Sequence, residues 1–303
     1  MKSKRKILLI GSSGQVGSAI ENLIQGRYDL VTLNRPILDF KKTKKLKKLI
    51  LRINPSIIIN AAAYTSVDLA ESESDLAFIC NQEAPKFLAK ICAEKRILLI
   101  HFSTDYVFDG TKIEAYVEKD LCNPINVYGR SKRQGEIEIL NAGCKNFIFR
   151  TSWVYGPVRH NFLKTILEFA SKKESISVVD DQVGAPTSTN LISSIVENCI
   201  TKYFKEDINQ RDYGIYHLSP LGKVSWYGFA CAIIKMANVE GFKVNIEEKD
   251  INRISSKDYS FVANRPMNSV LNVSKLKNFF EIEIFNWEKY LNKVLKQIRI
   301  GSI

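Results

Sequence analysis

The sequence has few of the residues that build metal sites and disulfide frameworks. Its 303 residues include three histidines, His101, His160 and His217, which lie far apart. The six cysteines show no C-x-x-C spacing, so neither a zinc site nor a disulfide framework is expected. None of these cysteines stands in a local nucleophile motif, and we expect them to be small buried hydrophobic residues. We therefore predict no bound metal.

Long apolar runs are also absent. No stretch approaches the roughly 18 consecutive apolar residues that a membrane-spanning helix needs. The apolar run at residues 7–10 is too short for the core of a signal peptide. With 45% hydrophobic and 25% charged residues and no internal repeat, the chain has the composition of a folded globular protein. We expect it to be cytoplasmic, with no membrane partner.

Acidic residues are outnumbered by basic ones. Lys and Arg number 44 against 32 Asp and Glu, which gives a net charge of +12 and a pI near 9.3. Such a charge fits a nucleic acid, a membrane surface, an anionic small substrate or a merely solvated surface. For the lysine-rich segment 41–48 we favour a solvated helix face. A nucleic-acid role lacks any recognisable binding module or basic stripe interleaved with aromatic residues, so we expect no nucleic-acid partner.

Apolar, strand-like segments alternate with helical patterns through the first half of the chain. The predicted strands cover residues 6–10, 30–33, 56–60, 98–102 and 146–150. Strands that are apolar throughout are typical of a parallel sheet covered by helices on both faces. The predicted fold class is therefore α/β, with a doubly wound parallel sheet of Rossmann type.

Beyond residue 155 this alternation loosens. Helical and strand patterns continue, including a helix at 162–171, a helix at 191–204 and a strand at 215–218, but without the earlier rhythm. We therefore expect residues 1–155 to form the Rossmann-type domain. Residues 156–303 would form a smaller lobe that is partly interleaved with the sheet.

Three glycines follow the first predicted strand and open a helix. Gly11 permits a tight turn, Gly14 lets the backbone approach a pyrophosphate, and Gly17 allows close packing of helix on strand. The spacing is G-x-x-G-x-x-G, which differs from the G-x-G-x-x-G of ordinary dehydrogenases. A glycine turn at this place also serves purely structural ends, so it indicates a dinucleotide without proving one.

The end of the second strand bears on the choice of dinucleotide. An acidic side chain there would bind the adenosine ribose and favour NAD, but this chain has Asn34 followed by Arg35. The missing carboxylate and the added guanidinium favour NADPH, with NADH as the alternative. A surface arginine after a strand is an equally simple explanation of Arg35.

Tyr128 and Lys132 stand four residues apart, on one face of a predicted helix. A nearby cation favours the phenolate, so we predict that Lys132 lowers the pKa of Tyr128 and brings proton transfer within reach. Upstream, the strand at 98–102 runs into Ser103 and Thr104, whose hydroxyls stand where open α/β sheets bind ligands. Each motif alone has a structural alternative, a surface pair or a turn cap. Their order along the chain is more specific.

Together these motifs resemble the extended short-chain dehydrogenase/reductase superfamily and, within it, the dTDP-4-dehydrorhamnose reductase family. The resemblance covers nearly the whole chain. It is carried by the segments 14–17 (GQVG), 60–65 (NAAAYT), 103–110 (STDYVFDG), 126–132 (NVYGRSK), 150–156 (RTSWVYG), 181–187 (DQVGAPT), 225–230 (SWYGFA) and 265–269 (RPMNS).

The resemblance implies NAD(P)H-dependent reduction of the C4 ketone of dTDP-4-dehydro-L-rhamnose to dTDP-L-rhamnose. It implies Tyr128 as proton donor, with Lys132 and Thr104 as the other catalytic residues, and it implies that Thr104, Asp105 and Trp153 hold the sugar. The implied cofactor site comprises Gly11, Gly14, Gln15, Val16, Gly17, Asn34, Arg35, Asp39, Phe40, Ala63, Tyr64 and Thr65, together with Tyr128 and Lys132.

Two alternative functions remain open. The first is a reductase of another nucleotide-linked 4-keto-6-deoxy sugar, because a family resemblance indicates chemistry more securely than the sugar. The second is a non-catalytic, cofactor-binding regulatory subunit, against which the intact Thr104, Tyr128 and Lys132 argue. The expected partner is a nucleotide-sugar substrate, and the chain is expected to be a monomer or a homodimer.

Three further residues have plain structural interpretations. We expect His217 to be a hydrogen-bonded histidine within a strand rather than a catalytic one. Trp226 stands three residues before Phe229, a helical spacing that is typical of core residues. For Trp153, which follows a strand end, stacking on a base or sugar competes with packing.

Overall fold

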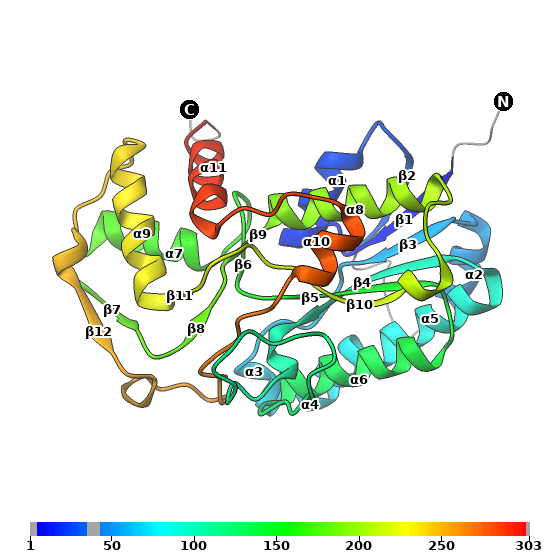
Figure 1. The fold of residues 1–303 in the computed structure, drawn as a ribbon, viewed down its shortest axis with the longest axis horizontal. Helices are drawn as coiled ribbons and strands as arrows, with labels where there is room; N and C mark the ends of the chain where they lie inside the picture. The colour runs from blue at the N-terminus through cyan, green and yellow to red at the C-terminus, as the bar shows by residue number, and fades with distance from the viewer. Residues whose placement is uncertain (1–4, 35–42, 301–303) are drawn as a thin grey trace.

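The computed structural model describes residues 5–34 and 43–300. Six parallel strands form a central sheet in the order β10-β5-β4-β3-β1-β2 (Figure 1). They span Lys6–Ile10 (β1), Asp29–Leu33 (β2), Ile57–Asn60 (β3), Leu98–Thr104 (β4), Asn146–Thr151 (β5) and Gly214–His217 (β10). The doubly wound parallel sheet predicted from the sequence is confirmed.

Helices cover both faces of this sheet (Figure 1). One face packs against α1 (Gln15–Ile24), α8 (Thr189–Phe204) and α10 (Ser274–Phe280). The opposite face packs against α2 (Thr43–Ile53), α5 (Ala84–Lys95) and α6 (Val127–Asn141). Between β3 and α5 the chain forms the short helices α3 (Leu69–Ser72) and α4 (Ser74–Phe78) and a π-helical turn, η1 (Ile79–Glu83).

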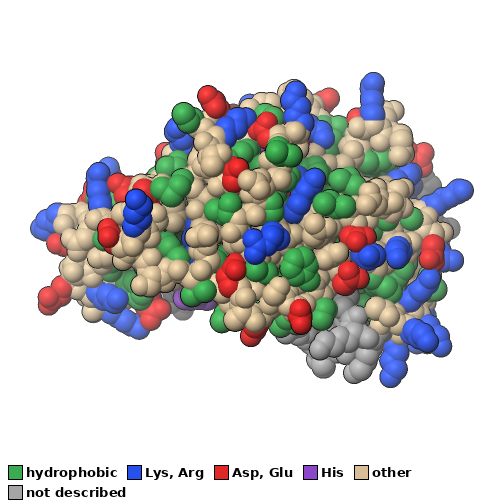
Figure 2. All heavy atoms as spheres, turned by 90° about the horizontal axis from the view of Figure 1, so that it is seen from below, with side chains coloured by type: hydrophobic (Ala, Val, Ile, Leu, Met, Phe, Trp, Pro, Cys, Tyr) green, Lys and Arg blue, Asp and Glu red, His purple; other side chains and the backbone are tan. Residues whose placement is uncertain are grey.

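The lysine-rich segment belongs largely to α2. Leu46 and Ile50 are buried against the sheet, whereas Lys44, Lys45 and Lys48 are exposed to solvent. The expected solvated helix face is confirmed for these residues. Figure 2 shows basic side chains dispersed over the lower face of the molecule, with acidic side chains among them. In residues 5–34 and 43–300 no helix is long and apolar enough to cross a membrane.

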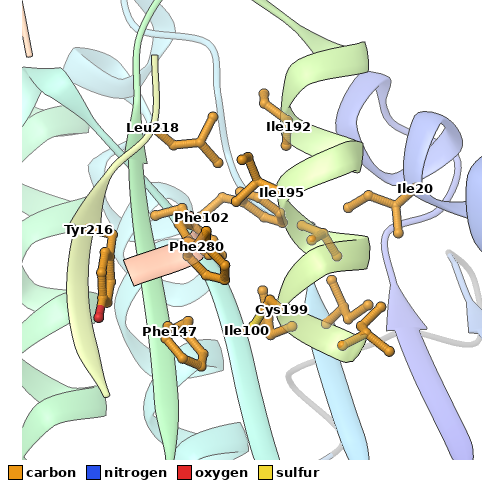
Figure 3. Packing of buried hydrophobic residues seen from close by; sticks show 14 of the residues in the cluster. Ile20, Ile100, Phe102, Phe147, Ile192, Ile195, Cys199, Tyr216, Leu218 and Phe280 are labelled. Carbon is orange, nitrogen blue, oxygen red and sulfur yellow. The ribbon is translucent and has the colours of Figure 1, made fainter. Parts of the chain in front are cut away.

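Alternate residues of each strand belong to different cores. Ile7 and Leu9 of β1 lie in the core beneath α1, α8 and α10, part of which Figure 3 shows. Leu8 and Ile10 lie in the core beneath α2, α5 and α6. All four side chains are fully buried, and each burial stabilises the fold by roughly 1.5–3 kcal/mol. This two-sided burial is why the strands are apolar throughout rather than alternating.

A second lobe lies beside the sheet, to its left in Figure 1. Its core is formed by α7 (Phe162–Lys172), β7 (Ile176–Val179), α9 (Trp226–Val239), β12 (Ile251–Ile254) and α11 (Trp287–Ile300). Strand β12 pairs in parallel with β7. Short strand pairs join this lobe to the sheet: β6 (Val154–Tyr155) with β9 (Thr187–Ser188), and β8 (Val183–Gly184) with β11 (Val224–Ser225).

The second half of the chain contributes to both parts of the molecule. Strand β10 extends the central sheet at β5, and α8 packs against α1. Short 3-10 turns connect other elements: η2 (Asp105–Val107), η3 (Gln210–Asp212), η4 (Glu248–Asp250) and η5 (Ser256–Asp258). The division at residue 155, and the assignment of 156–303 to substrate binding, stay predictions.

Candidate active site

The order of the strands reverses at β1, which has β2 on one side and β3 on the other. In open α/β sheets such a reversal leaves a crevice at the carboxyl ends of the strands, where ligands bind. A cavity of about 610 Å³ occupies this position. We call it the active-site cavity.

Most of the residues predicted for the site lie together on the wall of this cavity. From the cofactor set these are Gly14, Gln15, Val16, Ala63 and Thr65, and from the catalytic and substrate sets Thr104, Asp105, Tyr128, Lys132 and Trp153.

The glycine turn is shaped by close backbone contacts. Gly11 has a φ of +83°, and a Cβ there would lie 2.7 Å from the backbone nitrogen of Ala62. A Cβ on Gly17 would lie 2.1 Å from the carbonyl oxygen of Gly11, so only glycine lets α1 sit this close to β1. Gly14 differs, because a Cβ there would meet nothing nearer than 3.5 Å and the residue faces the cavity.

The start of α1 fits an anionic group. Gly14 is the N-cap, and no side chain among the described residues caps the helix. Its first N–H groups and the positive end of the helix dipole therefore face the cavity, as a bound pyrophosphate requires. Gln15 is held in place by Asn161, whose amide donates to its Oε1 at 3.0 Å.

Some predicted cofactor residues lie elsewhere. Asn34 braces the glycine turn, since its Nδ2 donates to the Ser12 hydroxyl at 2.8 Å and its Oδ1 accepts from the Ser13 N–H at 3.0 Å. Tyr64 turns its hydroxyl to Glu73 at 2.7 Å and does not line the cavity. The remaining three predicted residues, Arg35, Asp39 and Phe40, lie outside the described residues.

The side chains predicted to be catalytic come from β4 and α6. Thr104 ends β4, Tyr128 lies in the first turn of α6, and Lys132 lies one turn later. Asn126 caps this helix by accepting the Gly129 N–H at 2.7 Å. A Cβ on Gly129 would lie 2.2 Å from the carbonyl oxygen of Tyr106, so this glycine brings α6 close to the end of β4. The hydroxyls of Thr104 and Tyr128 are hydrogen-bonded as a result.

The electrostatics of the pair differ from the expectation drawn from spacing alone. Burial raises the pKa of Tyr128 to about 12, and the Thr104 hydrogen bond opposes this only partly. Burial lowers the pKa of Lys132 to about 8, and its Nζ donates to the carbonyl oxygen of Phe102 at 2.5 Å. The predicted lowering of the Tyr128 pKa is therefore wrong: burial raises this pKa, and Lys132 does not offset the rise. A protonated phenol at neutral pH is what a proton donor needs.

A buried ion-pair network lies on the inner side of α6. Glu136, one turn after Lys132, accepts from the Ser103 hydroxyl at 2.6 Å and from two nitrogens of Arg150 at 2.8 Å each. Arg133 adds a third partner at 2.7 Å. These contacts keep the pKa of Glu136 low despite full burial, and the carboxylate partly offsets the lowering of the Lys132 pKa.

Two stacked tryptophans form part of the cavity wall. Trp153 has a φ of +47° and stacks on Trp226, with ring centroids 3.6 Å apart and planes 8° apart. A Cβ on Gly184 would lie 2.6 Å from the Trp153 ring, so this glycine makes room for the stack. Trp226 packs against the core of the second lobe, as expected. It also lines the active-site cavity, and its spacing in the sequence did not indicate this second role.

Other residues at the site have supporting roles. Asn60, also missed from the sequence, lines the cavity at the end of β3 and bonds His101 at 3.1 Å. The signal in the sequence that would have identified Asn60 is a polar residue at the end of an apolar strand.

His217 is buried and its Nδ1 contacts the Tyr116 carbonyl oxygen at 3.1 Å, which confirms the structural interpretation. No cluster of metal-ligating side chains occurs within the described ranges.

Comparison with known proteins gives a consistent result. The family model described as "RmlD substrate binding domain" matches residues 5–300. A dTDP-4-dehydrorhamnose reductase of Aggregatibacter actinomycetemcomitans is 37% identical over 291 residues, covering 95% of this chain and 98% of the relative. The enzyme of the same name from Salmonella typhimurium is 34% identical over 297 residues, covering 96% and 97%.

Solved structures agree with the sequence relatives. The crystal structure of the dTDP-4-dehydrorhamnose reductase of Bacillus anthracis, in complex with NADP, superposes with a TM-score of 0.88 at 33% identity. The alignment covers 97% of this chain and 99% of that one. Because sequence and structure align along nearly their whole lengths, this chain belongs to the dTDP-4-dehydrorhamnose reductase family.

Proposed function

We propose that the protein uses NADPH to reduce the C4 ketone of dTDP-4-dehydro-L-rhamnose, giving dTDP-L-rhamnose. The observation that carries the proposal is the meeting of Thr104, Tyr128 and Lys132 on the wall of a cavity that begins at an uncapped helix N-terminus. The names of the sequence relatives support the choice of sugar. The site would lie in a cytoplasmic enzyme, monomeric or homodimeric.

The protein's own residues would supply the proton and the positioning. When bound, NADPH supplies the hydride. Tyr128, protonated at neutral pH, donates its hydroxyl proton to the oxygen of the ketone as that oxygen gains negative charge. Lys132 contributes positive charge beside the developing anion, and the Thr104 hydroxyl assists at the same oxygen. An acid of this kind contributes about 10²- to 10⁴-fold to the rate, and most of the remainder comes from positioning.

A neighbouring cavity suits the nucleotide part of the substrate. It has a volume of about 350 Å³ and shares Trp226 with the active-site cavity. Its wall includes the aromatic residues Phe169 and Phe261 as well as Arg265. Aromatic rings suit stacking on a planar base, and a guanidinium suits a diphosphate.

NADPH is proposed over NADH on two grounds. The Bacillus anthracis relative is crystallised with NADP, and Arg35 follows the second strand where a 2′-phosphate would lie. We expect Arg35→Ala to weaken NADPH binding about tenfold and to leave NADH binding within twofold, measured by titration of cofactor fluorescence. Equal losses for both cofactors would show that Arg35 does not read the phosphate.

The function is tested by offering the purified protein a panel of substrates. Keto-deoxy sugars linked to dTDP, UDP, GDP and CDP are each assayed with NADPH and NADH, following cofactor oxidation. We expect the dTDP sugar with NADPH to give a kcat/KM at least tenfold above the other pairs. A preference for another base would favour a different sugar reductase. Cofactor binding without turnover on any sugar would favour the regulatory subunit.

A further inference from the structure

Asp105 is an unusual carboxylate at the edge of the active-site cavity. It directly follows β4, lines the cavity and is only 2% exposed. Its Oδ2 atom has no hydrogen-bond partner among the described residues, and no ion pair neutralises the side chain there. A buried carboxylate without a counter-charge is costly, so it needs either a ligand or a proton.

The other oxygen of Asp105 is connected to the proton donor. The Thr104 hydroxyl and Asp105 Oδ1 are 3.0 Å apart, and the same hydroxyl is hydrogen-bonded to Tyr128. The Tyr106 N–H donates to Thr104 Oγ1 at 3.2 Å and fixes its position. A continuous chain of oxygen atoms therefore runs from Asp105 through Thr104 to Tyr128.

The groups that face Asp105 leave it close to balance between its two protonation states. Burial raises its pKa to about 7, and hydrogen bonds from Ser269 and Thr104 oppose the rise. Of the nearby cations, Arg265 pairs with Asp68 and contacts Tyr106, while Lys132 donates to the Phe102 carbonyl oxygen. Neither cation pairs with Asp105, so the carboxyl can be protonated near neutral pH.

We propose that Asp105 returns a proton to Tyr128, through the Thr104 hydroxyl, after each reduction. This inference rests on the proposed function and adds a step that follows the chemistry at the ketone. It assigns Asp105 a role as proton reserve beside the sugar contact implied by the resemblance.

The step balances as a transfer of protons alone. When Tyr128 has given its proton to the substrate oxygen, its phenolate takes the Thr104 hydroxyl proton, and an O–H bond forms at Tyr128 as one breaks at Thr104. The Asp105 carboxyl replaces the proton on Thr104 and is left ionised. The 3.0 Å separation serves a hydrogen bond in either direction. Asp105 takes its next proton from water when the product leaves the cavity.

The test compares the first turnover with the later ones. In Asp105→Asn we expect the rate of the first turnover of NADPH oxidation, followed by stopped flow at saturating keto sugar, to fall far less than the steady-state rate, because Tyr128 starts protonated. Steady-state turnover should fall at least tenfold. The wild-type kcat should decline above about pH 7, as Asp105 loses its proton, and the variant should lack this decline.

Chemical rescue separates proton delivery from mere structure. Asp105→Ala leaves a space in which formate can replace the missing carboxyl, so added formate should restore steady-state turnover, whereas Asp105→Asn should not respond. Asp75→Asn, the same chemical change at an exposed position on α4, is the matched control and should behave as the wild type.

The outcomes distinguish this proposal from the proposed function. If the wild type is active and Asp105→Asn has equal steady-state turnover, only the proton transfer from Asp105 is overturned. The same holds if Asp105→Asn only raises KM. It also holds if the first and later turnovers of Asp105→Asn slow equally and formate does not rescue Asp105→Ala. If the wild type fails to oxidise NADPH with every keto sugar tested, the proposed function is overturned, and the proton transfer from Asp105 with it.

Discussion

Among single residues, two ionisable side chains of the site are buried in a way that suits proton exchange but lowers stability. Asp105 is buried without a counter-ion, and Lys132, which is also buried, has a pKa lowered to about 8. Both groups are held where their charged forms are disfavoured, which is typical of groups that exchange protons near neutral pH. The sequence showed where these residues stand, but their isolation depends on what the fold leaves unpaired around them.

Replacing Asp105 should therefore stabilise the protein at neutral pH. The pKa of Asp105 is raised from 3.8 to about 7 on folding, so the unfolded state ionises first as the pH rises. Stability is lost across the window from about pH 4 to pH 7 and stays reduced above it. At about 1.4 kcal/mol per pKa unit, Asp105→Asn should raise the free energy of unfolding by roughly 2–4 kcal/mol at pH 8.

Urea unfolding at pH 8 and at pH 4 measures this difference. Near pH 4 the two proteins should unfold at nearly the same urea concentration, since Asp105 is then neutral in the folded state. A gain of equal size at both pH values would show that packing, and not ionisation, is responsible.

At the scale of elements, the position of α6 is set by glycines. A Cβ on Gly135 would lie 2.0 Å from the carbonyl oxygen of Asn81, in η1, and backbone cannot give way cheaply. The helix therefore rests directly on η1, and this contact fixes where Tyr128 and Lys132 lie relative to β4.

Gly135→Ala should push α6 outward. We expect a loss of roughly 1–3 kcal/mol in the free energy of unfolding, because overpacking outweighs the better helix propensity of alanine. Turnover should fall at least tenfold, since a displacement of about 1 Å at the chemistry costs that much or more. Gln134→Ala, exposed on the same helix, is the control and should change stability by less than about 0.5 kcal/mol.

Sequence patterns predict the longer strands and helices well. The strands of the central sheet and helices α7 and α8 were predicted within a few residues, because their apolar residues recur at strand or helix spacing. The two-residue strands β6, β8, β9 and β11 exist only through their pairing and have no pattern of their own. Helix α11 was missed, although Leu291, Val294 and Leu295 are buried at helical spacing.

At the scale of the whole molecule, a segment of the second half closes over the first. Asp68, in the loop after β3, accepts two hydrogen bonds from Arg265, at 3.1 and 2.7 Å. It also accepts the backbone N–H groups of Val262 and Ala263. This clamp holds the segment that carries Arg265 beside the aromatic cavity and Ser269 beside Asp105. Such contacts between distant segments were not predictable from the sequence patterns.

Loosening the clamp should affect the sugar nucleotide and not the cofactor. We expect Asp68→Asn to raise the KM for the keto sugar severalfold, with the NADPH dissociation constant within twofold of the wild type. The stability loss should stay below about 1 kcal/mol, because the Asp68 side chain is 41% exposed. Glu247→Gln, which breaks a fully surface ion pair with Lys249, is the control. A change in NADPH binding as large as the change in KM would contradict this role.

The clamp should also depend on pH. The hydrogen bond from Arg265 lowers the pKa of Asp68 below its value in the unfolded chain. Its contribution is therefore present above the unfolded pKa of about 4 and is lost as the pH falls through the folded value. Over the neutral range the clamp stays closed.

The net charge of +12 is explained only in part by the anionic ligands of the proposed reaction. A dinucleotide and a nucleotide sugar both carry diphosphates, so a positive field would attract them to the carboxyl edge of the sheet. The exposed lysines of α2 belong to a solvated helix face, and basic side chains are spread among acidic ones on the face that Figure 2 shows.

In the proposed reaction, Tyr128 gives the proton while this chain reduces a sugar ketone. The most direct measurement is the steady-state oxidation of NADPH by Tyr128→Phe with dTDP-4-dehydro-L-rhamnose, together with the NADPH dissociation constant of the same variant. We expect turnover to fall about 10²- to 10⁴-fold while cofactor binding stays within twofold of the wild type. A Tyr128→Phe variant with full activity would contradict it.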